Sequence, residues 1–462
     1  MPNDFELRGK RVLVVGLART GIATALFCAE REALVTATDI RNEAEIAEAA
    51  TRLRDAGVAV ALGAQGEKLF TDQDLIVPSP GVPADLPGLL AARTVGVTVW
   101  SEIELADRFL NGKLIGITGS NGKTTTTSLV EHILRNAGIS TVLAGNIGTP
   151  LIARVQETRD DTTTVAELSS FQLELIATFR PNISLFLNLT PDHLDRHHTL
   201  DAYRAAKARI FENQTEQDFA VLNADDPATT QLAPTRPRVY WFSRKQRVAQ
   251  GAYVRDGEIV FRYDGEEENV LRVEDIPLAG AHNLENVLAA VAACRLAGAG
   301  SAAIAKGVRS FSGVEHRLEF VAEIAGVRYY NDSKATNIDA TLKALDAFAG
   351  RILIILGGKD KGSDYTVLRQ PLRDKAILAL LIGAAADKIE KQIAGSVAIE
   401  RASTMERAVV VASHAAQAGD IVLLAPACAS FDQFQSYEHR GRVFKDLVHQ
   451  LERESAGAAS GK

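Results

Sequence analysis

Short apolar runs alternate with helix-spaced apolar positions from the start of the chain. Strand-like runs at residues 11–16, 33–38, 58–62 and 75–77 are separated by polar turns and by a helical pattern over 20–30. Short β-rich runs predict buried strands, whereas apolar residues on one face of a helical spacing predict amphipathic helices. Strands that alternate with helices favour a parallel sheet covered by helices. The first hundred or so residues are therefore predicted to form a small α/β domain.

The same alternation recurs in the middle of the chain. A helical stretch at 102–110 precedes a strand at 113–118, and further strands are expected at 163–166 and 183–187. Helices rich in Ala and Leu lie between 284 and 307. This pattern predicts a second α/β domain.

A third block repeats the alternation after a break near Ser312-Gly313. Its expected strands are 318–324, 327–330, 351–356, 379–382 and 421–424. The small, polar tail from residue 454 is expected to fray. A chain of 462 residues is long enough for several domains. We therefore expect three α/β domains, which span 1–102, 103–313 and 314–462.

Composition and charge exclude several classes of protein. Hydrophobic residues make up 46% and charged residues 24%, as in a soluble globular protein. The net charge is −7 and Lys and Arg form no dense run, so nucleic acid is not an expected partner. No stretch is long and apolar enough to span a membrane, and the first residues lack the apolar core of a signal peptide. Cys28, Cys294 and Cys428 show no zinc or disulfide spacing. These features favour a cytoplasmic protein.

A glycine-rich segment between a predicted strand and a predicted helix is the strongest chemical motif. It reads Gly116-Ile-Thr-Gly119-Ser-Asn-Gly122-Lys123-Thr124-Thr125. In such loops the backbone N–H groups and the helix N-terminus bind phosphates, a lysine reaches the outer phosphates, and a threonine holds Mg²⁺. The segment departs from the common GxxxxGK[ST] pattern because Ile117 stands where the first glycine is required. ATP or GTP is the expected ligand; the alternative is a glycine-rich turn with an accidental Gly-Lys-Thr.

This variant loop resembles that of the Mur ligases, and the resemblance covers nearly the whole chain. Further segments that match the family in order are Gly145-Asn146-Ile147-Gly148, Glu167-Leu-Ser-Ser-Phe-Gln172, Asp192-His193-Leu-Asp195-Arg196, His282-Asn283-Leu-Glu-Asn286, His316-Arg317, Asn331 to Asn337 and Pro426 to Ser430. The resemblance implies a Rossmann-like N-terminal domain, a P-loop ATPase-like central domain and a Rossmann-like C-terminal domain. It also implies a monomeric enzyme of peptidoglycan precursor synthesis.

The family couples a carboxylate to an amine through an acyl phosphate made with ATP. Positioning and cations on the phosphate oxygens are what phosphoryl transfer requires. By resemblance the catalytic residues are Lys123, Glu167, His193 and Lys207, and Mg²⁺ is held by Thr124, Glu167, His193 and Lys207. The residues that contact ATP would be Gly119, Asn121, Gly122, Lys123, Thr124, Thr125, Asn283, Asn286, Arg317, Asp332 and Lys334.

Each of these residues also has an ordinary structural explanation. Glu167 precedes Ser169-Ser-Phe-Gln172, which has the form of a capping box, and could be a solvated carboxylate beside a helix start. A loop histidine such as His193 is commonly a surface residue. Asn283 and Asn286 could be ordinary helix asparagines.

Lys207 is unusual even without the resemblance, because it lies on the apolar face of a predicted helix. The spacing i, i+4, i+7 and i+8 places it with Tyr203, Ile210 and Phe211. One explanation is a lysine whose stem covers apolar surface while its amine reaches water. The resemblance implies instead a lysine carbamylated by CO₂ that supports a second Mg²⁺.

The same resemblance implies that the first domain binds the UDP of UDP-N-acetylmuramoyl-L-alanine. Its turn Gly16-Leu-Ala-Arg19-Thr20-Gly21 would present N–H groups to a pyrophosphate. A dinucleotide domain is the alternative, but Ala18 replaces the second glycine of G-x-G-x-x-G. The expected contacts of the UDP substrate are Arg19, Thr20, Asp39, Arg41, Ser79, Asn146, Ser169 and Gln172.

Two segments of the third block resemble the branch of the family that adds D-glutamate. These are Gly357-Gly358-Lys359-Asp360-Lys361-Gly-Ser-Asp364 and Ser430-Phe431-Asp432-Gln433-Phe434. A substrate with two carboxylates needs a cation and several donors. By resemblance D-glutamate is bound by Thr336, Lys361, Ser430, Phe431 and Tyr437.

Two departures from this branch leave alternatives open. The family loop usually reads GGDGK where this chain has GGKDK, so either Lys359 or Lys361 could be the lysine that binds D-glutamate. Tyr437 stands where Phe is expected. Another Mur-type ligase, a folylpolyglutamate synthase-like ligase, and a P-loop ATPase that acts as a switch are the other hypotheses for the chain.

Overall fold

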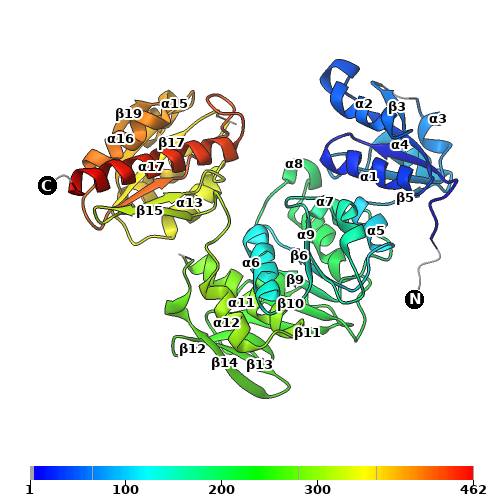
Figure 1. Ribbon diagram of the computed structural model, residues 1–462, viewed down its shortest axis with the longest axis horizontal. Helices are drawn as coiled ribbons and strands as arrows, with labels where there is room; N and C mark the ends of the chain where they lie inside the picture. The colour runs from blue at the N-terminus through cyan, green and yellow to red at the C-terminus, as the bar shows by residue number, and fades with distance from the viewer. Residues whose placement is uncertain (1–4, 65, 279, 361, 461–462) are drawn as a thin grey trace. The chain divides into compact units, whose positions relative to one another are not determined.

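The computed structural model describes residues 5–64, 66–278, 280–360 and 362–460. These residues form three β-sheets, each associated with helices (Figure 1). Contacts divide the chain into two compact units, Met1–Ile276 with Leu284–Ser310, and Pro277–Asn283 with Phe311–Lys462. The first unit contains two of the sheets and the second unit contains the third.

The first sheet is parallel and has the strand order β3-β2-β1-β4-β5. This is the order of a doubly wound nucleotide-binding fold without its sixth strand, and ligands bind to such folds beyond the carboxyl ends of the strands. Its strands are β1 Arg11–Val15, β2 Leu34–Asp39, β3 Ala59–Leu62, β4 Leu75–Pro78 and β5 Thr98–Val99. Its helices are α1 Arg19–Glu30, η1 Glu43–Glu45, α2 Ala47–Asp55, α3 Lys68–Thr71 and α4 Pro87–Thr94.

The second sheet has the order β14-β13-β12-β11-β10-β9-β6-β8-β7. Its strands are β6 Lys113–Thr118, β7 Thr141–Gly145, β8 Thr163–Glu167, β9 Ile183–Phe186, β10 Phe219–Asn223, β11 Arg238–Ser243, β12 Gly251–Arg255, β13 Glu258–Tyr263 and β14 Glu266–Arg272. The helical segments are α5 Glu102–Asp107, α6 Lys123–Asn136, η2 Leu151–Glu157, α7 Ser170–Leu173, α8 Leu194–His197, α9 Leu200–Ala208, η3 Arg209–Phe211, α10 Pro227–Thr230, η4 Val273–Asp275, α11 Ala281–Leu296 and α12 Ser301–Arg309.

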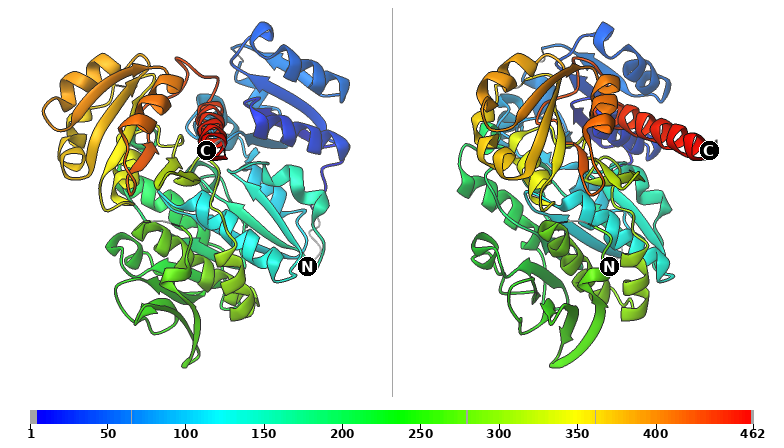
Figure 2. Two further views of the ribbon diagram at one scale, coloured as in Figure 1. Left: turned by 60° about the vertical axis from the view of Figure 1, so that its left-hand side comes forward. Right: turned by 90° about the vertical axis from the view of Figure 1, so that its left-hand side faces the viewer.

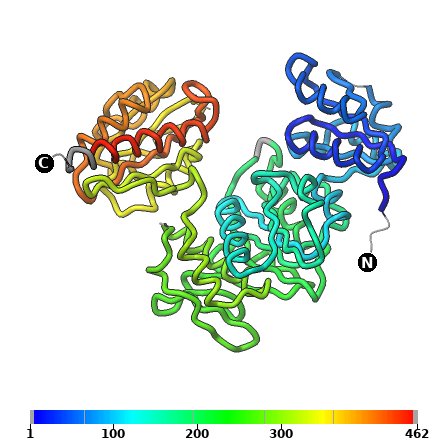
Figure 3. The backbone as a smooth tube through the Cα atoms, in the orientation of Figure 1, coloured from blue at the N-terminus to red at the C-terminus, as the bar shows by residue number. Residues whose placement is uncertain are grey.

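The third sheet has the order β15-β16-β20-β17-β18-β19. Its strands are β15 Glu319–Ile324, β16 Val327–Asn331, β17 Ile352–Gly357, β18 Ala376–Ile382, β19 Ala398–Ser403 and β20 Ile421–Leu424. Its helices are α13 Ile338–Asp346, η5 Tyr365–Leu368, α14 Arg369–Lys375, α15 Ala386–Ile393, α16 Met405–Ala415 and α17 Tyr437–Ser460. The chain adds β17, β18 and β19 outward and then returns to β20 between β16 and β17, a path that can be followed by colour in Figure 3.

Apolar residues of this third sheet fill two cores, one on each face. Ile352, Ile354 and Leu356 of β17 belong to one core, and Leu353 and Ile355 belong to the other. Side chains alternate between the faces of a strand, so a strand that is apolar throughout requires cover on both sides. The long helix α17 provides part of that cover and is drawn in red in Figure 2.

The fold class expected from the sequence is confirmed, with differences in detail. β10 to β14 were not expected, and β12, β13 and β14 are joined in antiparallel pairs. The expectation of a frayed tail is wrong, because α17 continues to Ser460. Buried Phe444 and Val448 anchor this helix. Within the described ranges, no helix has both the length and the apolar character needed to cross a membrane.

Candidate active site

The phosphate loop connects β6 to α6 and has the geometry of an anion site. Gly119 and Gly122 have φ values of +149° and +80°, which side chains with a Cβ rarely adopt. Lys123 begins α6, and its Nζ donates hydrogen bonds to the carbonyl oxygens of Gly119 and Ser120, both at 2.9 Å. Asn121 donates its backbone N–H to Asn188 Oδ1 at 2.8 Å. The loop is thus held open around the N-terminus of a helix, where phosphate oxygens bind favourably.

Glu167 lies beside this loop because β8 pairs with both β6 and β7. It is 3% exposed, and Thr124 Oγ1 donates to its Oε2 at 2.8 Å. Asn146 Nδ2 donates to Oε1 at 2.9 Å. Gly145, which pairs with Glu167, has a φ of +103°, and a Cβ there would come within 2.3 Å of the Glu167 carbonyl oxygen. The carboxylate of Glu167 and the hydroxyl of Thr124 therefore form an oxygen pair that suits Mg²⁺, which takes few protein ligands and completes its shell with phosphates and water.

Lys207 is buried against the same loop. It is 1% exposed, and its Nζ donates to Gly119 O at 2.9 Å and Thr118 Oγ1 at 3.3 Å. Burial, and after it the nearby charge of Lys123, lower the pKa of Lys207 from 10.5 to about 6. The amine thus does not reach water, and the explanation of a lysine whose amine reaches solvent is wrong.

His193 lies in the loop before α8 and is exposed, in contrast to Glu167 and Lys207. Its φ is +51°, its Nε2 is 3.6 Å from Asp192 Oδ2, and its ring packs edge-on against Phe171 at 4.9 Å between centroids. Ser169 and Gln172 form the capping box expected from the sequence at the start of α7. In the described part of the chain, no three His, Cys, Asp or Glu side chains are grouped as a metal site.

The two asparagines predicted to contact ATP lie in α11 but belong to different units. Thr126 Oγ1 donates to Asn286 Oδ1 at 3.3 Å, and this oxygen lies 2.2 Å from where a Cβ on Gly122 would be. Asn286 therefore touches the phosphate loop. Asn283 belongs to the second unit, where its N–H donates to Gly280 O at 3.0 Å.

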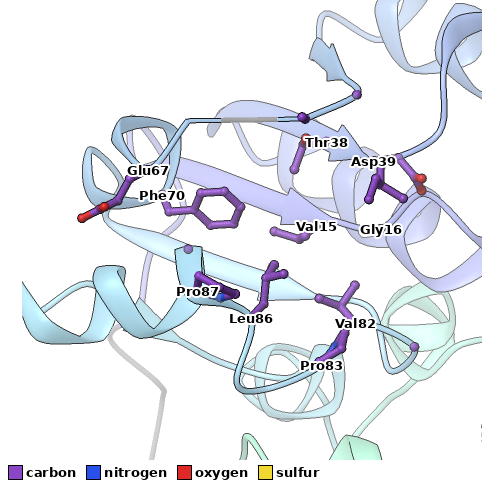
Figure 4. Close-up of a pocket in the computed structure, with 15 residues that line it drawn as sticks. Val15, Gly16, Thr38, Asp39, Glu67, Phe70, Val82, Pro83, Leu86 and Pro87 are labelled. Atoms are coloured by element: carbon purple, nitrogen blue, oxygen red, sulfur yellow. The ribbon is translucent and has the colours of Figure 1, made fainter.

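A cavity of about 540 Å³ opens at the carboxyl ends of β1 and β2 (Figure 4). Its wall is mostly apolar and includes Phe70, Val82 and Leu86. Asp39 lines it and is 8% exposed, accepting hydrogen bonds from the Leu17 N–H at 2.6 Å and from both ends of the Arg41 guanidinium. These bonds, with the side chain of Arg41 first, lower the pKa of Asp39 to about 2.

The other predicted contacts of the UDP substrate flank this cavity or lie elsewhere. Arg19 and Thr20 begin α1, and Ser79 Oγ donates to Gly16 O at 2.6 Å. Asn146, Ser169 and Gln172 lie in the central domain beside Glu167. The eight predicted contacts of the UDP substrate thus lie in two groups, one near the cavity and one beside Glu167, and both groups belong to the first unit.

Three loops of the second unit meet at the carboxyl ends of β16, β20 and β17. Asp332 follows β16 and donates its N–H to Leu424 O, and the Ala427 N–H donates to Ala335 O. Lys359 and Ala429 exchange backbone hydrogen bonds at 2.8 and 3.2 Å. The predicted D-glutamate residues Thr336 and Ser430 are therefore carried by adjacent loops.

The remaining predicted residues of this unit have contrasting environments. Burial raises the pKa of Asp332 to about 7, while Arg317 and Lys334 oppose this shift. Lys334 Nζ lies 5.3 Å from the ring centroid of Tyr437. Phe431 is 68% exposed. Lys361 lies outside the described residues.

Arg440 is a buried residue of this site that the sequence analysis did not single out. It is 0% exposed, and its guanidinium donates to Ser333 Oγ at 2.9 Å, Ser333 O at 2.8 Å and Cys428 O at 3.1 Å. It therefore joins two of the three loops. Arg440 lies four residues before buried Phe444, on the apolar side of α17. A charged residue at helical spacing from apolar residues is the same signal that made Lys207 unusual in the sequence.

Models of three protein-family domains match consecutive parts of the chain. A Mur ligase MurD-like N-terminal domain matches residues 10–101, a Mur ligase middle domain matches 117–294, and a Mur ligase glutamate ligase domain matches 316–428.

Curated relatives match over nearly the full length of the chain. Proteins of Koribacter versatilis and Solibacter usitatus are each 54% identical over 97% of this chain and 99% of their own length. A protein of Acidobacterium capsulatum is 54% identical over 96% of this chain and 97% of its own. All three are named UDP-N-acetylmuramoylalanine--D-glutamate ligase.

Solved structures share the fold at low sequence identity. A pseudomurein peptide ligase type C from Methanothermus fervidus aligns with a TM-score of 0.58 at 18% identity, covering 96% of this chain and all of its own. The UDP-N-acetylmuramate-alanine ligase MurC of Thermotoga maritima aligns with a TM-score of 0.57 at 19% identity over the same shares. These likenesses concern the three-domain architecture alone.

Proposed function

The chain belongs to the Mur ligase family, and from this premise we propose that it joins D-glutamate to UDP-N-acetylmuramoyl-L-alanine with the consumption of ATP, in peptidoglycan precursor synthesis. The full-length relatives that share 54% of its sequence support this substrate pair. The observation that carries the ATP-dependent step is the phosphate loop with Glu167 bonded to Thr124 at 2.8 Å. We retain the domain limits 1–102, 103–313 and 314–462, a monomeric state and a cytoplasmic location as parts of this proposal.

The reaction begins with the substrate carboxylate. One of its oxygens attacks the γ-phosphorus of ATP, the bond from phosphorus to the bridging oxygen of ADP breaks, and an acyl phosphate forms. Lys123 and the N–H groups of the loop neutralise the phosphate oxygens, which is the main catalytic requirement of this step. Thr124 and Glu167 would hold Mg²⁺, which when bound adds positive charge at the same oxygens.

The second step forms the amide bond. The neutral amine of D-glutamate attacks the acyl carbon, phosphate leaves with the bonding electrons, and the nitrogen loses a proton as the amide forms. The loops that carry Thr336 and Ser430 would hold the two carboxylates of D-glutamate, together with a lysine of the glycine loop, because charge-assisted hydrogen bonds are strong and directional. Asn283, Asn286, Arg317, Asp332 and Lys334 remain proposed contacts of ATP.

Lys207 has the environment that carbamate formation needs. Only a neutral amine attacks CO₂, forming an N–C bond and losing a proton to give an anionic carbamate. Burial against the phosphate loop favours the neutral amine, since desolvation disfavours the charged form. The carbamate oxygens, with His193, would complete a second Mg²⁺ site, in which the imidazole binds as the neutral form.

A substrate-dependence assay tests the proposal. ADP release is measured with UDP-N-acetylmuramoyl-L-alanine and each of several amino acids, and again with one substrate omitted. Release that requires both the UDP substrate and D-glutamate supports the proposal. Release with another amino acid identifies another Mur-type ligase, and release without either substrate identifies an ATPase.

Lys123→Ala serves as the site-directed arm of this assay. The change removes the lysine cation at the outer phosphates, so we expect product formation to fall by well over tenfold, a barrier increase of more than about 1.4 kcal/mol. Lys306→Ala, at an exposed position of α12, is the matched control. Activity of Lys123→Ala within tenfold of wild type contradicts the assignment of the phosphate loop.

A further inference from the structure

Gly81 and Val82, at the end of a turn that begins at Ser79, line one side of the first-domain cavity. Val82 donates its N–H to Ser79 O at 2.9 Å, and the Ser79 hydroxyl donates to Gly16 O at 2.6 Å. Val82 Cγ2 lies 2.9 Å from where a Cβ on Gly16 would be, so the turn is packed against the β1–α1 loop. Figure 4 labels Gly16 and Val82 at this side of the cavity. A ligand that fills the cavity must therefore contact or displace this turn.

The back of the same turn is bonded to a residue of the central domain. Arg196 in α8 donates from one guanidinium nitrogen to Val82 O and to Glu174 Oε2, both at 3.0 Å. The side chains of Arg196 and Glu174 are only 17% and 18% exposed. Water screens such a partly buried pair less than it screens a surface ion pair, so the attraction between the two side chains is stronger.

Arg196 is also tied to the loop that carries His193. Its backbone N–H donates to His193 O at 3.1 Å. The Arg196 guanidinium lies 4.9 Å from the ring centroid of Phe171, and the His193 ring packs against the same phenyl ring at 4.9 Å. Movement of the guanidinium therefore changes the surface on which His193 rests.

Glu174 extends the connection into the start of α7. Its Oε1 lies 3.3 Å from His197 Nδ1, and His197 Nε2 lies 2.9 Å from Ser170 Oγ. The His197 ring is stacked on Phe171 at 5.4 Å. Phe171 is thus enclosed by Arg196, His193 and His197, and α7 begins three residues after Glu167. A contiguous set of polar and aromatic contacts links the cavity wall to the segments beside the phosphate loop.

We propose that Arg196 is a positioning residue that couples filling of the first-domain cavity by the UDP substrate to the placement of His193 beside the nucleotide. This inference rests on the proposed function. Arg196 touches neither reacting group; it acts through the Val82 carbonyl on one side and through Phe171 on the other. Because coupling between two binding sites is reciprocal, the UDP substrate and Mg²⁺-nucleotide must each change the affinity of the other by the same factor.

Calorimetric titration tests this coupling without turnover. The affinity of the full-length enzyme for UDP-N-acetylmuramoyl-L-alanine is measured with and without Mg²⁺ and a non-hydrolysable ATP analogue. For wild type we expect the two affinities to differ by at least about fivefold, the lower end of typical couplings. The affinity ratio is the affinity for the UDP substrate with Mg²⁺ and the ATP analogue divided by the affinity without them. Arg196→Met keeps an unbranched stem against Phe171 but removes the guanidinium, so its affinity ratio should approach one. Each ligand alone should bind within about threefold of wild type.

Two further variants separate coupling from a general loss of structure. Arg204→Met removes an arginine of α9 that pairs with Asp201, and it should keep the wild-type ratio. Glu174→Gln removes the partner charge and should lower the ratio in the same way as Arg196→Met. If Arg196→Met unfolds, Arg196→Lys replaces it, because lysine keeps the charge but not the planar fork and should also lower the ratio.

The outcomes distinguish this inference from the proposed function. A ratio near one in wild type, or a wild-type ratio in Arg196→Met or its lysine replacement, overturns the coupling. Failure of the wild-type enzyme to bind the UDP substrate or to consume it with D-glutamate overturns the proposed function itself.

Discussion

At the scale of single residues, Lys207 shows how burial sets the chemistry of a side chain. Its Nζ is enclosed by the phosphate loop, and burial lowers its pKa to about 6. Lys207→Ala should lose activity by at least about a hundredfold, because it removes the proposed carbamate. Short carboxylic acids such as acetate should restore part of the loss by supplying oxygen ligands in the vacated space. Initial rates at increasing acetate concentration measure this rescue.

The control for the rescue is Lys123→Ala, which changes the lysine at the end of the phosphate loop. This variant should also lose activity, but acetate cannot replace a cation, so no rescue is expected. Full activity of Lys207→Ala, or loss without rescue together with an unmodified amine in a high-resolution density map, argues against the carbamate.

The two lysines of the glycine loop give a second residue-scale prediction. Lys361→Ala should raise the KM for D-glutamate by about 10- to 100-fold, the cost of about 1.5–3 kcal/mol for a lost hydrogen bond to a charged group. The KM for ATP should change far less. Steady-state kinetics of Lys359→Ala provide the matched comparison. If Lys359→Ala rather than Lys361→Ala changes the KM for D-glutamate, Lys359 is the residue that binds the substrate.

At the scale of elements, helix α5 carries a buried carboxyl group that makes stability depend on pH. Glu102 is 1% exposed and accepts a hydrogen bond from the Ile152 N–H at 2.7 Å. Burial raises the pKa of Glu102 from 4.5 to about 7. Between these pH values the folded protein keeps a proton that the unfolded chain releases. This group therefore makes the protein less stable as pH rises from about 4.5 to about 7.

Glu102→Gln should remove this dependence, because glutamine is never ionised and keeps an acceptor oxygen for the Ile152 N–H. We expect the variant to gain stability relative to wild type between pH 5 and pH 8, by up to about 3 kcal/mol. Denaturant unfolding of both proteins at the two pH values measures the change. If the free energies of unfolding of the variant and the wild type differ by the same amount at both pH values, the pKa of Glu102 is not raised.

Helix α17 gives a second prediction at this scale, since its Arg440 joins the loops of Ser333 and Cys428. Arg440→Met should leave buried carbonyls without donors, at a cost of about 1–3 kcal/mol for each. We expect a lower unfolding temperature for the second unit and a higher KM for D-glutamate. Arg440→Lys should restore little, because lysine cannot make the same forked set of bonds. If Arg440→Lys has the wild-type unfolding temperature and KM for D-glutamate, then only the positive charge at this position is required.

At the scale of the whole molecule, the division into two compact units predicts separable unfolding. Calorimetry should show two thermal transitions. UDP-N-acetylmuramoyl-L-alanine at about 100 times its Kd should stabilise the first unit by about 2.7 kcal/mol, because the cavity beside Asp39 lies there. The midpoint temperature of the second transition should not change by more than the experimental error. A single transition that moves as a whole contradicts independent units.

Much of the fold and the phosphate loop could be predicted from the sequence because their signals are local. A strand such as 113–118 is identified by its own apolar residues. The loop after it is identified by its glycines, because Gly119 and Gly122 have positive φ values that glycine adopts most readily. The antiparallel strands β12 to β14 were missed because their alternation is weak and their cover comes from elsewhere in the chain. The capping box of Ser169 and Gln172, which needs only four residues, was found correctly.

The three-domain α/β architecture and the order of its motifs follow from the amino-acid sequence, since apolar periodicity and turn residues act over short distances. Which of those motifs meet depends on how the chain folds in three dimensions. Glu167 lies beside Thr124 because β8 pairs with β6, and Arg196 reaches the Val82 carbonyl across 114 positions of sequence. Strand pairing and the burial of charged side chains such as Lys207 and Arg440 depend on contacts between distant segments. Such contacts leave no local pattern beyond a charge on an apolar face.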